Sequence, residues 1–463
     1  MTRIVLDITT TSRWTSPDVG ITRTERKFAE YLLNNEIDST AFVRTTSNDA
    51  LEWIAPDRVA SMLGLAVGNG PSRNESHGEM EPDPSDWGWK RRTADFGLRR
   101  AKRITSSAID CAERLAPMPA RHHLRAAAQH SAMAAREVIH SRRHHEAGID
   151  ATTSFGSAVG WDHLGPADTY VALGLDWDDK SIQHIYRMKQ RYHFRSVHLC
   201  YDLIPAMFPE WLPSDSIVYD QYFLDLLHTG DAFACISDES RRALQAFAIS
   251  SGLAPVNAAT IHLGADFAEP ELVAVKRLDG ERFVLFVSTI EPRKNHRFLL
   301  EVWERVIARG LGTKLVFVGK RGWKENEVFA TLSARSDLSD HVLHLDQVTD
   351  SELAWLYERC LFTVFPSLYE GWGLPVVESL LHGKVCIAST AKAVQEAGLG
   401  LAIHIDVFEG QRWVDAVCNL ISDPDELVRL EQCLRGEKDR LLASLSWSSF
   451  GERLLSFVRT STS

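Results

Sequence analysis

The chain has 463 residues, of which 44% are hydrophobic and 24% charged, which is typical of a globular protein with two or three domains. No stretch approaches the roughly 18 consecutive apolar residues of a membrane-spanning helix, and the first residues lack the long apolar core of a secretory signal. The net charge of −11 argues against general nucleic-acid binding, and the seven scattered cysteines form no C-x-x-C pair. We therefore expect a cytoplasmic protein with reduced thiols and no metal centre.

The N-terminal half is predicted to be a Rossmann-like domain spanning residues 1–270. Residues 3–8 ("RIVLDI") predict a strand, residues 9–20 a turn-rich loop, and residues 21–35 an amphipathic helix. Residues 232–247 ("AFACISDESRRALQAF") predict a further strand, turn and helix. In that segment, Ser237 is placed to cap the helix.

A polar stretch and a basic stretch interrupt this domain. Residues 68–88 are rich in Gly, Pro, Ser and acids, so we expect a mobile loop. Residues 90–145 carry thirteen Lys or Arg against four Asp or Glu, a net charge of +9 that leaves −20 for the rest of the chain. Helices with a cationic face here would dock on an anionic membrane surface. Alternatively, the segment packs against the acidic remainder of the protein.

The second half alternates apolar strands with amphipathic helices, which predicts a parallel sheet covered on both faces. We expect a second Rossmann-like domain over residues 271–445 and a C-terminal helix over 446–463 that packs back toward the N-terminal domain. The predicted strands are 282–288, 314–319, 341–346, 361–367 and 385–389, and the predicted helices are 295–310, 325–336, 351–360 and 374–383.

Ligands of open parallel sheets bind outside the carboxyl ends of the strands. The loop "TIEPRKN", residues 289–295, follows the first strand of this sheet and carries Arg293 and Lys294 at the start of a helix. Paired cations at such a place suit a diphosphate. The alternative is a pair of solvated surface charges.

The stretch "SLYEGWGLPVVESLLHG", residues 367–383, has the features of a phosphate-binding turn. Gly371 and Gly373 allow close approach of the backbone to a ligand, and Pro375 suits the first turn of a helix. Because a helix dipole favours an anion just ahead of its first residue, we expect a phosphate at Gly373 and Leu374.

Two carboxylates, Glu370 and Glu378, flank this turn. Carboxylates accept hydrogen bonds from hydroxyl groups, and a ligand with hydroxyls on both sides of a diphosphate is a nucleotide sugar. Paired carboxylates are also typical of glycosidases, but a hydrolase does not need a phosphate-binding helix terminus.

The segments "STIEPRKN", "LVFVGKRGW", "SELAWLYERC", "FPSLYEGWGLPVVESLLHGKVCIAS" and "SWSSFGERLL" occur in this order over residues 280–455. Together they resemble the retaining glycosyltransferases of family 4, which have an α/β GT-B fold with two Rossmann-like domains facing a cleft. The sequences of the segments "TIEPRKN" and "YDLIP" are most similar to those of mannosyltransferases that assemble bacterial surface polysaccharides such as lipopolysaccharide.

The resemblance also implies roles for the residues of the second domain. Glu370 would contact the hydroxyls of the donor sugar, while Arg293 and Lys294 would stabilise the departing diphosphate electrostatically and without a metal. These three residues form the expected catalytic set. The expected donor-binding set consists of Glu378, which would bind the ribose, together with Gly373, Leu374, Trp372, Gly371 and Gly20.

In the resembled family the N-terminal domain binds the acceptor. The segment "DVGITRTERKF" matches its first loop with Gly20 and Arg23, although Gly20 also fits a plain turn. The segment "LCYDLIP" keeps Asp202 but has Tyr201 where the family often has a histidine. Tyr201 can still donate a hydrogen bond to a sugar or phosphate, and Asp202 fits either this acceptor region or a helix or turn cap.

Family members retain the anomeric configuration by front-face attack, in which the leaving phosphate helps to deprotonate the acceptor and no protein nucleophile is needed. The resemblance therefore implies transfer of a sugar, with mannose from GDP-mannose as the donor prediction, to a glycan or lipid-linked saccharide. No cofactor is expected. Such an enzyme would be cytoplasmic, or peripheral on the inner face of the membrane. The alternative is a non-catalytic nucleotide-sugar-binding subunit or scaffold of a polysaccharide assembly complex, which the unusual Tyr201 favours.

Overall fold

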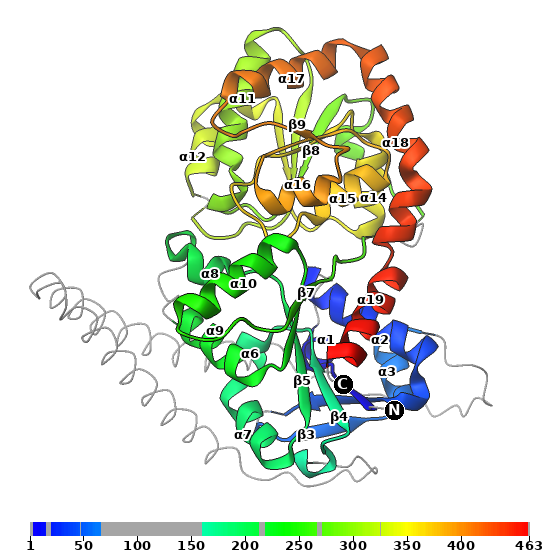
Figure 1. The fold of residues 1–463 in the computed structure, drawn as a ribbon. Helices are drawn as coiled ribbons and strands as arrows, with labels where there is room; N and C mark the ends of the chain where they lie inside the picture. The colour runs from blue at the N-terminus through cyan, green and yellow to red at the C-terminus, as the bar shows by residue number, and fades with distance from the viewer. Residues whose placement is uncertain are drawn as a thin grey trace, which may run out of the picture. The chain divides into compact units, whose positions relative to one another are not determined.

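A computed structural model describes residues 3–14, 20–46, 48–65, 160–212, 218–265, 271–324 and 326–461 of the chain. The loop predicted at 68–88 and the basic segment predicted at 90–145 lie outside these residues. The described part contains two β-sheets with helices packed on them (Figure 1).

The first sheet has the strand order β3-β2-β1-β4-β5-β6-β7, and all its pairings are parallel except that between β2 and β3. Its strands are β1 (Arg3–Asp7), β2 (Thr40–Thr45), β3 (Leu51–Ile54), β4 (Asp168–Ala172), β5 (Arg195–Cys200), β6 (Ala232–Cys235) and β7 (Ala258–Thr260). Its helices are α1 (Thr9–Arg13), α2 (Gly20–Asn35), α3 (Pro56–Met62), α6 (Asp176–Asp179), α7 (Ile182–Tyr192), α8 (Ile204–Met207), α9 (Val218–Thr229) and α10 (Asp238–Ser250), with short 3₁₀ turns η1 (Ile37–Ser39), η2 (Trp161–His163) and η3 (Pro209–Trp211).

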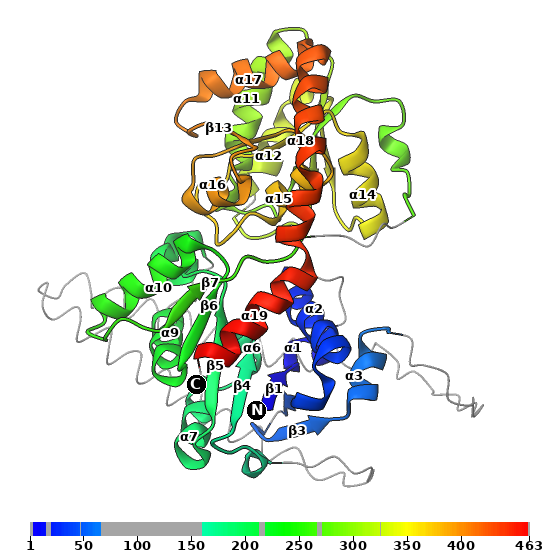
Figure 2. The same cartoon turned by 45° about the vertical axis from the view of Figure 1, so that its right-hand side comes forward.

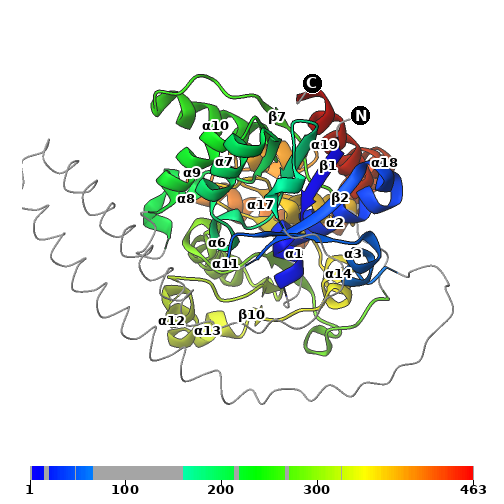
Figure 3. The ribbon, with the colours of Figure 1, turned by 90° about the horizontal axis from the view of Figure 1, so that it is seen from below.

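The two faces of this sheet bury alternate residues, as the two-residue period of a strand requires. In β1, Ile4 and Leu6 belong to a core that includes Phe28 of α2. Val5, between them, belongs to a second core that includes Ile185 of α7. Helices α7 and α9 lie side by side over this second face (Figure 3). Both faces are therefore covered, which explains why the strands read as continuous apolar runs.

The second sheet is parallel throughout, with the order β10-β9-β8-β11-β12-β13. Its strands are β8 (Phe283–Val287), β9 (Lys314–Val318), β10 (Val342–Leu345), β11 (Thr363–Phe365), β12 (Cys386–Ala388) and β13 (Ile403–His404). The other elements are η4 (Lys276–Leu278), η5 (Pro292–Lys294), α11 (His296–Ala308), α12 (Asn326–Ala334), α13 (Ser336–Ser339), α14 (Asp350–Arg359), α15 (Leu374–Leu381), α16 (Lys392–Gly398), α17 (Gly410–Ser422), α18 (Pro424–Leu445) and α19 (Trp447–Ser461).

The last helix, α19, packs on α2 of the first sheet, while α18 packs on α15 and α17 of the second (Figure 2). A Cβ at Gly451 would lie 2.4 Å from the ring of Tyr31, so glycine is what allows the two helices to approach this closely. Phe450 packs edge-on against Phe28, with 6.3 Å between ring centroids. The C-terminal helix thus buries its apolar face against the N-terminal half of the chain.

The structure differs from the sequence prediction directly after β1, where the expected loop contains the short helix α1. Two carboxylates accept hydrogen bonds from its backbone: Asp7 from the N–H of Thr9 at 2.8 Å, and Glu25 from that of Thr11 at 2.6 Å. Because Glu25 comes from α2, its contribution is tertiary and has no local sequence signal.

Among the described residues, no helix has the length and apolar character needed to cross a membrane.

Candidate active site

The turn between β11 and α15 touches the first domain through its backbone. A Cβ at Gly371 would lie 2.4 Å from the carbonyl oxygen of Tyr201, so this contact requires glycine. The hydroxyl of Ser240, on α10, lies 2.8 Å from the Tyr201 carbonyl oxygen and 3.2 Å from that of Gly371. Gly371 therefore has a structural role in addition to its predicted role near the donor.

The predicted phosphate site lies at the N-terminus of α15, where the first N–H groups of a helix have no partner within the helix. Gly373 precedes the helix and Leu374 is its first residue. A Cβ at Gly20, the first residue of α2, would lie 3.3 Å from the Leu374 side chain. The structure thus brings Gly20, Gly373 and Leu374 together. Trp372 is different, because its indole is only 3% exposed and stacks on His262, so any contact with a donor falls to its backbone.

Glu370 lies between the two predicted cations. Its Oε2 accepts from Nη1 of Arg293 and its Oε1 from Nζ of Lys294, both at 2.5 Å. Nη2 of Arg293 also contacts Oε1 of Glu291 at 2.7 Å. The guanidinium thus bridges two carboxylates, and Glu370 is only 7% exposed. The reading of Arg293 and Lys294 as solvated surface charges is therefore wrong, because both pair with a buried carboxylate.

Burial and the neighbouring charges shift the pKa values of the side chains in this cluster. Burial raises the pKa of Glu370, but the charges of Arg293 and Lys294 outweigh it and hold the pKa below its ordinary value. Burial lowers the pKa of Lys294, and the neighbouring Arg293 lowers it further. Burial raises the pKa of Glu291 despite the charge of Arg293. Glu370 is therefore the anionic centre of the cluster, and Glu291, which the sequence analysis did not single out, orients Arg293.

Glu378 lies in α15 and is 5% exposed. Its Oε2 accepts a hydrogen bond from the Tyr357 hydroxyl at 2.9 Å, and its Oε1 lies 3.5 Å from Nη1 of Arg23. Burial raises the pKa of Glu378, and the charge of Arg23 opposes this. The sequence placed Arg23 in the acceptor region, whereas the structure brings it to the carboxylate predicted to bind ribose.

The segment after β5 contributes Tyr201 and Asp202. The Tyr201 hydroxyl donates to the carbonyl oxygen of Leu173 at 2.6 Å, so in this structure it serves the first domain rather than facing a ligand. Oδ1 of Asp202 accepts from the N–H of Ile204 at 2.9 Å, which makes Asp202 a turn cap at the start of α8. Burial raises the pKa of Asp202, while the charges of Arg293 and Lys294 lower it. Asp202 thus combines a cap with a place near the charges of Glu370, Arg293 and Lys294.

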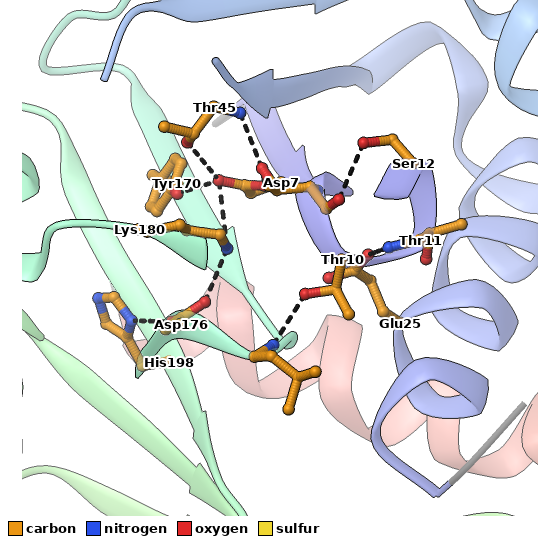
Figure 4. A network of polar contacts seen from close by, with 12 residues as sticks. Asp7, Thr10, Thr11, Ser12, Glu25, Thr45, Tyr170, Asp176, Lys180 and His198 are labelled. Carbon is orange, nitrogen blue, oxygen red and sulfur yellow. Dashed lines mark hydrogen bonds and ion pairs between the residues drawn. The ribbon is translucent and has the colours of Figure 1, made fainter. Parts of the chain in front are cut away.

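A second buried polar network joins the end of β1 to α6 and to the interiors of β4 and β5 (Figure 4). Nζ of Lys180 is 2.7 Å from Oδ1 of Asp176 and 3.3 Å from Oδ2 of Asp7. The Tyr170 hydroxyl donates to Oδ2 of Asp7, and Nδ1 of His198 lies 3.5 Å from Oδ2 of Asp176. The side chain of Lys180 has no exposed surface, and its charge is balanced chiefly by these two carboxylates.

Glu25 lies beside this network and is fully buried. Its Oε1 accepts from the backbone of Thr11, whereas Oε2 has no hydrogen-bond partner among the described residues. Burial raises the pKa of Glu25 to about 8, although Lys180 partly opposes this effect. Since Lys180 already pairs with Asp7 and Asp176, burial favours the neutral form of Glu25. No local sequence pattern marks this network, because its members come from separate elements.

Comparison with solved structures identifies the fold. The chain is similar to Alr3699/HepE of Anabaena, solved in complex with UDP and glucose, with a TM-score of 0.56, 12% identity, and coverage of 99% of this chain and 100% of that one. It is also similar to a UDP-forming α,α-trehalose-phosphate synthase of Burkholderia xenovorans, with a TM-score of 0.50, 13% identity and coverage of 65% and 75%. The chain has the GT-B fold of glycosyltransferases, as the sequence predicted.

The sequence comparisons identify the second domain. Residues 269–433 match the family described as glycosyl transferases group 1, and this part of the chain is a glycosyltransferase group 1 domain. The chain is 34% identical over 128 residues to O-antigen chain mannosyltransferase B of Escherichia coli. This alignment covers 27% of this chain and 33% of that protein. The chain is 26% identical over 195 residues to the serotype-specific mannosyltransferase WbdA of Escherichia coli, covering 39% and 24%.

A third relative is the O-antigen chain mannosyltransferase RfbU of Salmonella typhimurium, with 24% identity over 158 residues, covering 34% of this chain and 43% of RfbU. The matched regions thus span between about a quarter and less than half of these curated relatives. The predicted resemblance to glycosyltransferases of surface-polysaccharide assembly is confirmed for this part of the chain.

Proposed function

We propose that the protein is a retaining glycosyltransferase that moves mannose from GDP-mannose to a glycan or lipid-linked saccharide without a metal. The observation that carries this proposal is the position of Glu370, held between Arg293 and Lys294 at 2.5 Å from each, in the loop that leads to the N-terminus of α15. The similarity to O-antigen mannosyltransferases supports mannose as the transferred sugar.

In the proposed reaction the donor diphosphate occupies the N-terminus of α15, and its negative charge grows as the bond to the sugar breaks. Arg293 and Lys294 lie where they can stabilise that charge, because both are fixed by buried carboxylates before any ligand arrives. Glu370 would accept a hydrogen bond from the sugar and, as the partner of both cations, would place the sugar next to the leaving group. The acceptor hydroxyl attacks from the same face and passes its proton to the leaving phosphate, so the configuration is retained.

The test is an assay of nucleoside diphosphate release from GDP-mannose and other nucleotide sugars, with a mannosylated acceptor, in buffer containing EDTA. Transfer from GDP-mannose that survives EDTA, with an α-linked product by NMR, is the expected result. Arg293→Gln should reduce the rate at least a hundredfold, since removing one transition-state donor commonly costs this much. The matched control is Arg297→Gln on α11, because Arg297 is exposed and pairs with Glu327.

The alternative, a subunit that binds nucleotide sugars without turning them over, is favoured by the use of the Tyr201 hydroxyl within its own domain. Donor binding by calorimetry together with no release of nucleoside diphosphate, with or without acceptor, would establish this alternative and refute the proposed transfer. Release of UDP or dTDP in place of GDP would instead correct the donor assignment.

A further inference from the structure

The Glu378 carboxylate is held from two sides by residues of different helices. The Tyr357 hydroxyl, from α14, donates to Oε2 at 2.9 Å. Nη1 of Arg23, from α2, lies 3.5 Å from Oε1 and Nη2 lies 3.8 Å from Oδ1 of Asp350. The two oxygens of Glu378 therefore have different environments: one accepts a close hydrogen bond from a neutral hydroxyl, and the other faces a longer, partly exposed ionic contact.

Tyr357 is well suited to hold one oxygen at a fixed point. It is completely buried, in a core that includes Phe283 and Leu356. Its ring stacks on His382, with 5.0 Å between centroids and an angle of 9° between the planes. A tyrosine side chain packed on all sides cannot change rotamer without disturbing that core, so its hydroxyl defines where Oε2 must lie.

We propose that Tyr357 is a positioning residue for the recognition of the donor ribose: its hydroxyl fixes Oε2 of Glu378, so that Oε1 is presented to a ribose hydroxyl in the place that Arg23 faces in this structure. This inference rests on the proposed function, because it assumes that a nucleotide donor binds at α15. Tyr357 itself does not contact the ligand.

The expected effect follows from removing only the hydroxyl. In Tyr357→Phe the buried Oε2 loses its donor, and the carboxylate can rotate or become protonated instead of presenting Oε1 to the ribose. Loss of a hydrogen bond to a charged group weakens ribose recognition by about tenfold. Contacts of the diphosphate with Arg293 and Lys294 do not depend on Tyr357, so they should be retained.

The experiment measures the affinity of the full chain for GDP and for 2′,3′-dideoxy-GDP by isothermal titration calorimetry. The UDP pair is used if the wild-type protein prefers UDP. The readout is the ratio of the two dissociation constants, because it isolates the ribose hydroxyls from base and phosphate. The wild-type protein should prefer the ribonucleotide, Glu378→Gln should abolish the preference, and Tyr357→Phe should reduce it about tenfold while leaving the affinity for the dideoxy analogue unchanged.

Tyr170→Phe is the matched control, because Tyr170 is also a buried tyrosine whose hydroxyl donates to a carboxylate, that of Asp7, in the other domain. It should lower stability without changing the ratio. An unchanged ratio in Tyr357→Phe, or an equal loss for both nucleotides, would overturn the positioning role while leaving the proposed function intact. If the wild-type protein binds none of GDP, UDP and dTDP, the proposed function fails and the role of Tyr357 fails with it.

Discussion

Replacement of Glu25 by glutamine should stabilise the protein at neutral and alkaline pH. Glu25 is fully buried and its Oε2 has no partner among the described residues, so ionisation would place an unpaired charge in the interior. Glutamine keeps the shape of the side chain and the oxygen that accepts from Thr11. Since it cannot ionise, it removes the cost of keeping this carboxyl neutral.

The magnitude follows from the pKa of Glu25, which burial raises from 4.5 to about 8. Because the folded pKa is the higher one, the neutral carboxyl favours the folded state fully below pH 4.5, and this advantage is lost as the pH rises to about 8. Each pH unit in this window corresponds to about 1.36 kcal/mol. The wild-type protein should therefore lose about 3 kcal/mol of this contribution by pH 7 and about 5 kcal/mol above pH 8.

The assay is urea denaturation of the wild-type protein and Glu25→Gln at pH 5, 7 and 9. The free energy of unfolding of the variant, relative to the wild type, should increase with pH and then level off. The control is Glu30→Gln on the same helix, because Glu30 forms a partly exposed pair with Lys27 and its replacement should cost under about 1 kcal/mol at every pH. A difference between Glu25→Gln and the wild type that does not change with pH would show that Glu25 is ionised in the folded protein and refute the reasoning.

Three further predictions concern ligands and charge. Glu370→Gln should abolish sugar transfer. The variant should bind GDP about tenfold more tightly in calorimetry, because Arg293 and Lys294 lose a competing anion. Weaker GDP binding would show that Glu370 does not compete with the diphosphate for these two cations. Glu291→Gln should lower kcat about tenfold with little change in the donor KM, because Glu291 orients Arg293, and an unchanged kcat would exclude that role. Replacing the four basic residues within 99–103 by glutamine should release the protein from anionic vesicles at moderate salt in a flotation assay, and wild-type protein that never binds such vesicles would end the membrane proposal.

For Glu370 the sequence predicted a contact with the donor sugar, and the structure adds ion pairs with Arg293 and Lys294. Its place in a loop gives no sign, at the level of sequence, of a role in stability. In the structure it neutralises two nearly buried cations, so Glu370→Ala would leave them unpaired and destabilise the protein by about 3 kcal/mol or more. The segment "TIEPRKN" predicted Arg293 and Lys294 in the loop after the first strand of the second sheet, but it carried no information about their partner 76 or 77 residues away.

The sequence by itself predicted strands β8 to β12, helices α11, α12, α14, α15 and α19, and a candidate phosphate turn before α15. It did not predict β13, α13, α16, α17 or α18. The predicted features are local: a strand is read from a run of apolar residues, a helix from its periodicity, and a phosphate turn from adjacent Gly and Pro residues. The same local logic predicted the cap of α10, where Ser237 accepts from the backbone of Ser240 as expected.

Only the tertiary structure decided which side chains meet. It brought Arg23 to Glu378 across 355 positions of sequence, committed the Tyr201 hydroxyl to Leu173, and gathered Asp7, Asp176 and Lys180 into one buried network. The energies that fix such contacts depend on burial and on distances of a few ångströms, which follow from the packing of sheets and helices. No local pattern in the sequence encodes them, so the roles proposed for Tyr357, Glu291 and Glu25 could only be inferred once the fold had placed their partners.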